Sequence, residues 1–355
     1  MEGIPKVCRG LNVRVDAFEH YSRYGRWFSS LVAKKLSRFS LSPDHHIFHG
    51  FTSASLESMQ FLSAKGIPCL LQQIDAGRSH YQIVDEERSR WPGWQDASIA
   101  VPESYFRRIE QEWEVASSVI VNSDWSRRAL LEQGVPESKL IVIPLAYETG
   151  DRKANDRIGL ADPSADGSLV RNSPQEPLRV LWAADVLLAK GIQYLIAAAK
   201  RLGSRKVIFL IAGTVGISRE AVAGAPKNMQ FLGRVPRDQV AELYESSDVY
   251  VLPTLSDGFA LTQLEAMAHG MPVITTPNCG AVVTNGEDGF VVPIRDEVAL
   301  ADAIARLDDD RELLRRMADS AERKVQQFSM EGYGNRIVAA VAENLNRHKQ
   351  PPAGR

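Results

Sequence analysis

Asp257, Gly258 and Glu265 have the residue types and spacing to bind a ligand that carries both phosphates and sugar hydroxyls. A short apolar run precedes them, and a helix is expected to begin near Ala260. A loop between a buried parallel strand and a helix points unpaired backbone N–H groups at an anion. Gly258 would let the backbone approach a phosphate without a Cβ clash, and Glu265 could accept hydrogen bonds from a ribose diol. The alternative is an ordinary helix N-cap at Ser256 or Asp257.

The elements that must position these residues alternate between strands and helices, which is typical of βαβ units around a parallel sheet. In the first half, strands are expected near 46–51, 67–72, 119–122 and 140–144, and helices near 18–38, 55–65, 103–116 and 125–133. In the second half, strands are expected near 179–183, 206–212, 229–233, 248–253, 272–275 and 289–292, and the last three helices near 297–307, 311–328 and 330–347. The pattern predicts an α/β protein.

Residues 149–177 interrupt this alternation with glycines, prolines and scattered charges, as an interdomain linker or a long surface loop does. We therefore expect a first domain over 1–148, a linker over 149–177 and a second domain over 178–329. A final helix and tail over 330–355 could cross back to the first domain. A doubly wound domain usually opens with a strand and a glycine-rich turn, but this chain begins with a basic, helix-like segment. The first domain is therefore expected to be reduced or truncated.

Composition excludes several classes of protein. The 355 residues carry a formal net charge of −2, which gives no electrostatic reason to expect nucleic acid as a partner. Apolar residues make up 44% of the chain, but no run of about 18 of them suits a membrane span. The first residues lack the apolar core of a signal peptide, and the three cysteines, odd in number and widely spaced, indicate neither a disulfide framework nor a metal site. We expect a cytoplasmic protein.

The segment 18–39 is the candidate for peripheral contact with a membrane. Residues 1–40 contain eight Lys or Arg and three Asp or Glu, which gives a local charge of +5. Basic amphipathic helices can lie on anionic membranes. The alternative, which the sequence favours, is a helix that packs its apolar side on its own domain. The apolar residues at near-helical spacing are Phe18, Tyr21, Phe28, Leu31, Val32 and Leu36.

The segment DGFALTQLEAMAHGMPVI, which begins at Asp257, resembles the paired-acid motif of the family 4 glycosyltransferases. The resemblance implies a retaining, metal-independent enzyme with the GT-B fold, in which two Rossmann-like domains with parallel sheets face a cleft. It further implies that the amides of Gly258, Phe259 and Ala260 hold the donor diphosphate. Glu265 would hold the ribose, and Asp257 would contact the transferred sugar. The family usually has Glu at the first acidic position, so Asp257 is one methylene shorter.

Two further segments resemble the same family. LWAADVLLAKGIQYL is similar to its strand–loop–helix unit, and the resemblance implies that Lys190 neutralises the diphosphate. Asp185 stands where the family commonly has a basic or amide residue, and an acid that faces the phosphates would weaken donor binding. Gly213, Gly233 and Val235 resemble the strand ends around the nucleotide, where backbone near Val235 would hold the base. Ordinary strand-to-helix turns are the alternative for both glycines.

The first half of the chain resembles the family less. Ile74 stands where the family often has a histidine after a strand, so that role is not carried over. Asp75 and His80 follow closely and could face the acceptor side of the cleft. A lone histidine more often has a structural role, and that alternative stays open for His80.

Together these observations predict a glycosyltransferase that moves a sugar from a nucleotide-diphospho-sugar to an unknown acceptor, without a cofactor or a metal ion. The first domain would be the acceptor side and the second domain the donor side. One alternative is another nucleotide-sugar enzyme of the same fold, such as an epimerase. The other is a non-catalytic nucleotide-sugar-binding or partner protein, which Asp185 and the short first half favour. A dehydrogenase is not expected, because no G-x-G-x-x-G follows a strand.

Overall fold

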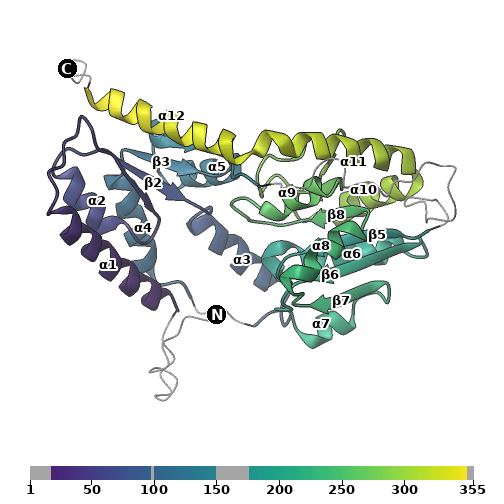
Figure 1. Ribbon diagram of the computed structural model, residues 1–355. Coiled ribbons are helices and arrows are strands. Elements are labelled where there is room, and N and C mark those ends of the chain that lie inside the picture. Colours follow the sequence, from purple (N-terminus) through teal and green to yellow (C-terminus); the bar gives the residue numbers. More distant parts are fainter. Residues whose placement is uncertain (1–16, 97–99, 149–175, 350–355) are drawn as a thin grey trace.

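A computed structural model describes residues 17–96, 100–148 and 176–349, and it contains two parallel β-sheets with helices packed on them (Figure 1). The four-stranded sheet belongs to the first half of the chain and the six-stranded sheet to the second half. The expected α/β class is therefore confirmed. Nearly all of the expected linker lies outside the described residues.

The first sheet has the strand order β1-β2-β3-β4, and all neighbouring strands are parallel. Its strands are β1 (Phe48–Phe51), β2 (Cys69–Gln73), β3 (Ser118–Val121) and β4 (Leu140–Val142). Every residue of β2 and β3 is buried, as expected for central strands of a parallel sheet that is covered on both faces. The helices packed on one face are α2 (Leu56–Ser63), α4 (Glu103–Val115) and α5 (Asp124–Glu132), which share a buried apolar cluster with β2 and β3.

The last helix, α12 (Met330–Lys349), covers the other face of the first sheet, although it follows the second sheet in sequence (Figure 1). Ala340 of this helix shares a buried cluster with Leu70 and Ile120, whose side chains alternate with those that face α2 and α4. The buried hydroxyl of Ser118 also donates to Asn344 Oδ1 at 2.9 Å. The chain therefore returns from its second half to pack on its first.

The second sheet has the strand order β10-β9-β8-β5-β6-β7 and is also parallel throughout. Its strands are β5 (Leu178–Ala183), β6 (Val207–Ala212), β7 (Met229–Gly233), β8 (Val249–Leu252), β9 (Val273–Thr275) and β10 (Gly289–Val291). The helices of this half are α6 (Ile192–Leu202), α7 (Arg219–Ala223), α8 (Arg237–Glu245), α9 (Leu261–Ala268), α10 (Glu297–Asp309) and α11 (Arg311–Val325). A single large apolar core, in which Trp182, Phe209 and Tyr250 are fully buried, joins the sheet to these helices.

The direction of strand addition in the second sheet reverses at β5. From β5 the chain continues to β6 on one side, whereas β8 pairs with β5 on the other side. Parallel sheets bind ligands beside the carboxyl ends of their strands at such a switch point. The loops that leave β5 and β8 there contain Lys190 and Asp257.

The sequence patterns placed these strands correctly, with ends that differ by only a few residues, but they did not predict one helix. That helix is α3 (Arg78–Arg90), which lies between the two sheets (Figure 1). Its sequence, RSHYQIVDEERSR, is dominated by charged and polar residues, so it shows little apolar periodicity. Arg78 pairs with Glu103 and Glu110 in the first half of the chain, and Glu87 is hydrogen-bonded to the second half, so contacts with both halves compensate for this weak pattern.

Along most of its length the first helix, α1 (Ala17–Leu36), packs on its own domain through small residues, with Phe18 and Leu36 in contact near its two ends. Gly25 lies so close to the loop after β1 that a Cβ atom on it would stand 2.0 Å from the carbonyl oxygen of Ser53. The hydroxyls of Ser29 and Ser58 are buried and 3.0 Å apart. Only residues with little or no side chain permit this close approach of α1 to α2.

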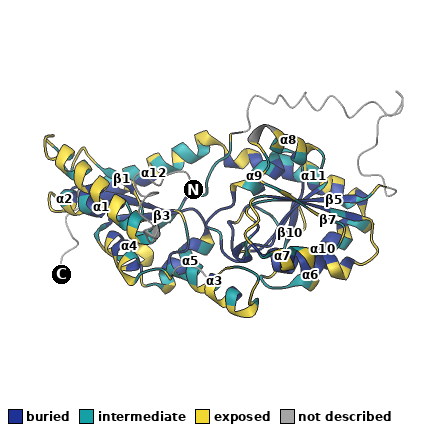
Figure 2. Cartoon of the chain, turned by 90° about the horizontal axis from the view of Figure 1, so that it is seen from below, coloured by how far each residue is buried: buried dark blue, intermediate teal, exposed yellow. Residues whose placement is uncertain are grey.

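Five large side chains of α1 are exposed, as is much of the helix (Figure 2). Of the six apolar residues expected to pack inward, Phe18, Val32 and Leu36 are half-buried. The prediction is wrong for Tyr21, Phe28 and Leu31, which are 59%, 51% and 51% exposed. Tyr24 and Trp27 are exposed as well. We call these five residues the aromatic face of α1. Among the described residues, no helix has the length and apolar character needed to cross a bilayer.

Candidate functional site

Lys190 and Asp257 meet at the switch point of the second sheet. Lys190 ends a short 3-10 helix, η3 (Leu188–Lys190), and its Nζ forms an ion pair with Asp257 Oδ2. The two side chains are 25% and 20% exposed, so the pair is accessible but partly desolvated. Gly191 allows this geometry, because its φ of +84° is left-handed and a Cβ atom would stand 2.0 Å from the carbonyl oxygen of Pro253.

In the loop between β8 and α9, fewer backbone N–H groups are unpaired than the family resemblance implied. The N–H of Asp257 donates to the carbonyl of Asn278 at 2.8 Å, and that of Ala260 donates to the carbonyl of Cys279 at 3.1 Å. The N–H groups of Gly258 and Phe259 donate to no group in the part of the chain that the structure describes. The first N–H groups of α9 also lack partners within the helix. An anion at this loop would therefore meet Gly258, Phe259 and the start of α9, rather than Ala260.

Glu265 projects from α9 and is held by a tyrosine. Tyr244, at the end of α8, donates its hydroxyl hydrogen to Glu265 Oε2 at 2.9 Å. The Tyr244 side chain is almost fully buried and stacks on His269, with ring centroids 5.0 Å apart. Burial raises the pKa of the Tyr244 phenol, and the charge of Glu265 raises it further, so the phenol stays protonated and remains a donor. One carboxylate oxygen of Glu265 is thus fixed, and the other is available to a ligand.

The first domain reaches this loop through the end of β2. A Cβ atom on Gly258 would stand 1.9 Å from the carbonyl oxygen of Ile74, which also accepts a hydrogen bond from Asn122 Nδ2 at 2.8 Å. The loop after β8 and the segment after β2 are therefore in backbone contact. Packing at this contact therefore requires glycine at position 258, whether or not a ligand binds there.

His80, in the first turn of α3, contacts the loop that carries Asp257. Its Nδ1 lies 3.1 Å from Ser256 Oγ, across the boundary between the two halves of the chain. Burial lowers the pKa of His80, and Lys190 lowers it further, while the charges of Asp75 and Asp257 oppose the shift. The imidazole is therefore neutral near pH 7. The sequence could not distinguish a structural from a site role for His80, whereas the structure places it against Ser256, close enough to Lys190 and Asp257 for their charges to affect its pKa.

Asp75 stabilises the turn between β2 and α3 in the first domain. Its Oδ1 accepts hydrogen bonds from Gln73 Nε2 at 2.6 Å and from the N–H of Gly77 at 2.9 Å. These bonds shape the turn that leads into α3. Asp75 therefore contributes its charge to the surroundings of His80, while its hydrogen-bonding capacity is partly used.

Gly213, Gly233 and Val235 lie along the strand ends of the second sheet. A Cβ atom on Gly213 would stand 1.9 Å from the carbonyl oxygen of Ala184, and the N–H of Gly213 donates to the carbonyl of Gly233 at 2.8 Å. Gly233 has a φ of +67°, so both glycines also satisfy backbone requirements. Asp185 is exposed, and Lys190 pairs with Asp257 rather than with it.

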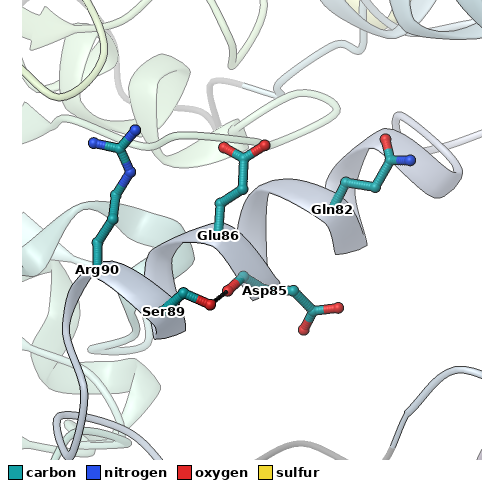
Figure 3. Close-up of a pocket in the computed structure, with 5 residues that line it drawn as sticks. All are labelled: Gln82, Asp85, Glu86, Ser89 and Arg90. Carbon is teal, nitrogen blue, oxygen red and sulfur yellow. Dashed lines mark hydrogen bonds between the residues drawn. The ribbon is translucent and has the colours of Figure 1, made fainter.

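An open hollow lies elsewhere, along one face of α3. Its volume is about 760 Å³, it is wide open to solvent, and none of the predicted site residues lines it (Figure 3). It is lined by Gln82, Asp85, Glu86, Ser89 and Arg90, which share one face of the helix. Because one helix supplies the whole lining, this hollow has no opposing wall, and the contacts at Lys190 and Asp257 are the better guide to the site. Among the described residues, no group of His, Cys, Asp and Glu could hold a metal ion.

Two α/β halves, each built on a parallel sheet and in contact with each other, define the GT-B class. Solved structures support this class: sucrose-phosphate synthase from Thermosynechococcus elongatus aligns with a TM-score of 0.65 at 21% identity, over 97% of this chain and 81% of that one. HepE from Anabaena in complex with UDP aligns with a TM-score of 0.63 at 16% identity, over 89% of this chain and 82% of that one. The expected GT-B fold is therefore confirmed.

Sequence comparison identifies the family of the second half. Residues 177–310, which contain the second sheet and the Lys190–Asp257 pair, match the family Glycosyl transferases group 1. This confirms the resemblance to the family 4 glycosyltransferases over that half of the chain.

Curated relatives agree with this assignment. A D-inositol 3-phosphate glycosyltransferase of Nocardia farcinica is 27% identical over 253 residues, which cover 64% of this chain and 53% of that protein. The lipopolysaccharide core biosynthesis mannosyltransferase LpsB of Rhizobium meliloti is 37% identical over 135 residues, which cover 36% of this chain and 37% of that protein. The chain thus spans about half the length, or less, of these two relatives.

Three contacts of the site could not be read from the sequence. They are the hydrogen bond from Tyr244 to Glu265, the contact of His80 with Ser256, and the approach of Gly258 to Ile74. Each joins residues that are separated by 21 positions or more, so no local pattern signals it.

Proposed function

We propose that this chain transfers a sugar, with retention of configuration, from a nucleotide-diphospho-sugar to an acceptor hydroxyl. The bond between the anomeric carbon and the diphosphate oxygen breaks, and the electron pair leaves with the diphosphate. The acceptor oxygen forms the new bond to the anomeric carbon, and its proton passes to the departing diphosphate. The observation that carries this proposal is the ion pair of Lys190 and Asp257 beside the unpaired amides of Gly258 and Phe259.

In this proposal, the donor diphosphate displaces Asp257 from Lys190. At about 4 Å and an effective dielectric of 20, one pair of opposite unit charges attracts by about 4 kcal/mol. A diphosphate carries more charge than one carboxylate and can also accept hydrogen bonds from the loop amides, so it competes well for the lysine. Asp257 is then free to accept a hydrogen bond from a hydroxyl of the transferred sugar, while Glu265 holds the ribose. Lys190 and the amides stabilise the charge that develops on the leaving diphosphate.

This arrangement also suggests roles for the rest of the chain. Residues 178–329 would bind the donor, with Gly213, Gly233 and Val235 near the nucleotide, and residues 1–148 would form the acceptor side, with His80 and Asp75 near the reacting sugar. The neutral state of His80 and its place beside Asp257 support a role at the acceptor side. We propose a cytoplasmic location, supported by Cys69 and Cys279, which are free and buried.

Calorimetric titration with UDP-, GDP- and ADP-sugars tests the donor site. The wild-type chain should bind one of these donors, and Glu265→Ala should weaken that binding by about 2 kcal/mol, which is more than tenfold. Glu242→Ala, on the neighbouring α8, is the control and should bind normally. Equal binding by all three proteins would remove Glu265 from the site.

Product analysis with a labelled donor tests the reaction. Label in a glycoside whose anomeric configuration matches that of the donor supports transfer with retention. Label that stays on the nucleotide with an inverted sugar centre would instead identify an epimerase. Tight donor binding without turnover, across sugar, lipid and polyol acceptors, would identify a non-catalytic binding protein.

We further propose that the aromatic face of α1 contacts an anionic membrane surface. Tyr and Trp side chains favour the boundary between water and hydrocarbon, and Phe and Leu bury their apolar surface there. Basic residues accompany this face on the same helix, including Arg23, Arg26, Lys34 and Lys35, and they complement anionic lipid headgroups. The small residues on the opposite side of α1 are already used for packing, so the helix has no other apolar side to present.

Co-sedimentation with vesicles tests the membrane contact. The chain should bind vesicles that contain phosphatidylglycerol, should bind phosphatidylcholine vesicles less, and should lose binding when Trp27 and Phe28 are changed to Ser. Val338→Ser, which removes an apolar residue that is 66% exposed on α12, is the control. Failure to bind either kind of vesicle would overturn this proposal. A dimer that the Trp27 and Phe28 changes dissociate would assign the face to a second copy of the chain.

A further inference from the structure

Glu87 is a fully buried carboxylate on α3 that the proposed reaction does not use. Its side chain is 0% exposed, although charged groups are costly to bury without partners. Three groups of the second half compensate for that cost. Arg295 Nε donates to Glu87 Oε1 at 2.6 Å, while Gln193 Nε2 and the Tyr194 hydroxyl donate to Oε2 at 2.8 and 2.9 Å. One carboxylate of the first half is therefore enclosed by the second half.

These partners connect Glu87 to the predicted donor site. Gln193 and Tyr194 lie in the first turn of α6, immediately after Lys190 and Gly191. Gln193 Nε2 also donates to the carbonyl of Leu188 at 3.0 Å, so the same amide group holds both Glu87 and the 3-10 helix that carries Lys190. The position of Lys190 relative to α3 is thus fixed by buried hydrogen bonds rather than by surface contacts.

The other end of α3 carries His80. Residues 80, 84 and 87 have the i, i+4, i+7 spacing that places them on one side of a helix, and Val84 between the other two is also buried. His80 contacts Ser256 at one end of this side, and Glu87 contacts Arg295 and α6 at the other end. The opposite side of α3 lines the open hollow of Figure 3, where Glu86 makes a solvent-exposed pair with Arg295.

The backbone of Arg295 supports a dedicated contact. Its φ of +64° is in the left-handed region, which residues with a Cβ atom rarely adopt. In this conformation its guanidinium reaches Glu87 through Nε and Glu86 through Nη2, the latter at 2.6 Å. Glu86 is 56% exposed, so that pair is screened by solvent and contributes little. The buried pair with Glu87 is the contact that compensates for the strained backbone.

We propose that Glu87 is a positioning residue that fixes α3 against the second half of the chain and thereby holds His80 beside Lys190 and Asp257. This inference rests on the proposed role of His80 in the site, but the position of His80 can be measured without any turnover. Glu87 itself touches neither the donor site nor a reacting atom.

The test compares Glu87→Gln with Glu86→Gln, a matched change of the exposed neighbour that shares Arg295. In the chain labelled with ¹⁵N-histidine, the His80 resonance is assigned from His80→Asn and titrated by NMR. Glu87→Gln removes the charge that holds Arg295, so α3 should loosen and His80 should become more hydrated. Its pKa should then rise toward the ordinary value, because burial is the largest cause of its lowering. Asp75, Lys190 and Asp257, the charged groups that face His80, are unchanged in both variants.

Activity and donor binding supply the second readout. Because Lys190, Gly258 and Glu265 all belong to the second half, donor affinity should be the same in Glu87→Gln and wild type. The turnover number should fall by roughly ten- to a hundredfold, since small misplacements of a reacting group have effects of this size. Glu86→Gln should leave both quantities unchanged.

Specific results would overturn the inference. If the His80 titration and the turnover number of Glu87→Gln match those of wild type while thermal stability falls, Glu87 only holds the fold together. If Glu87→Gln does not fold, Tyr194→Phe removes one of the three donors and should produce a smaller change of His80 in the same direction. No change in that variant would also refute the proposal. An inactive wild-type chain whose His80 still responds to Glu87→Gln would refute the proposed function and leave the positioning role standing.

Discussion

Gly258 and Ile74 are 184 residues apart in sequence, yet a Cβ atom on Gly258 would stand 1.9 Å from the carbonyl oxygen of Ile74. This is a contact between backbones, so no rotation of a side chain could relieve the clash. It joins the loop that carries Asp257 to the segment that leads into α3. The separation of the two halves at the candidate site is therefore set by the absence of a side chain at position 258.

Gly258→Ala should separate these two segments. We expect the free energy of unfolding to fall by about 1–3 kcal/mol, as for other overpacked sites, and turnover to fall by at least about tenfold. Gly334→Ala is the control: Gly334 lies in α12 with no neighbour within 4 Å of an added Cβ atom, so this change should stabilise the helix by up to about 1 kcal/mol. Denaturant unfolding and turnover assays measure both effects. Normal turnover in Gly258→Ala would show that the site tolerates a shift of this loop.

Lys190→Ala should weaken binding of the diphosphate. The change removes the positive charge and leaves Asp257, which is 20% exposed, to repel the anion. We expect the nucleoside diphosphate of the preferred donor to bind at least about 2 kcal/mol more weakly by calorimetry. Lys200→Ala removes an exposed lysine from α6 and should bind normally. The dependence of affinity on salt should also decrease in Lys190→Ala, because a charge contact is lost.

Tyr244→Phe should reduce donor affinity through Glu265. The phenol hydroxyl is the group that fixes Glu265 Oε2, and its loss should cost about 1 kcal/mol, or roughly fivefold in affinity. Tyr333→Phe is the matched control, because the Tyr333 hydroxyl accepts a hydrogen bond from Gln72 on the face of the first sheet that α12 covers. That change should affect stability alone. Equal donor affinities for the two variants would contradict a link from Tyr244 to the ribose.

The stability of the chain should fall as the solution is acidified from about pH 7.5 to about pH 5.5. Burial lowers the pKa of His80 below 6.5 in the folded protein. The unfolded chain therefore takes up a proton at a higher pH than the folded chain, and the free energy of unfolding decreases as the pH falls through 6.5 and toward the folded pKa. Burial lowers the pKa of His49 in the same direction.

Thermal unfolding of wild type, His80→Asn and His49→Asn across this pH range measures the two contributions. Each variant should lose only its own part of the pH dependence, so the differences between variants isolate the histidines from the titrating carboxylates. A pH dependence that survives unchanged in His80→Asn would mean that His80 titrates normally in the folded protein.

Much of the fold could be predicted from local sequence. Continuous apolar runs such as 249–252 identify strands that are buried on both faces, and the intervening helices have the amphipathic period that sheet packing requires. The elements of the second half of the chain were the easiest to predict, because its strands, loops and glycines follow one another in a regular order. The helix α3 was not predicted, because its sequence shows little apolar periodicity. Hydrogen bonds through Glu87 and His80 hold it in place instead.

The direction in which α1 faces shows where local patterns fail. Its aromatic residues have helical spacing, and the sequence favoured burying them on the first domain. In the structure Gly25 and Ser29 form the buried side, because only small residues allow the helix to lie against Ser53 and Ser58. The spacing of apolar residues indicates that a helix has two different sides. The shape of the neighbouring surface decides which side is buried.

The sequence by itself determined the strands, the class of the fold and the order of the residues that could bind a diphosphate and a ribose. These features depend on residue spacing and on backbone preferences, which act over a few positions. Only the tertiary structure decided that Lys190 pairs with Asp257, that His80 lies beside them, and that the Ala260 amide is already bonded. Such contacts depend on how strands are ordered in a sheet and how two sheets meet, and no local segment of the chain contains that information.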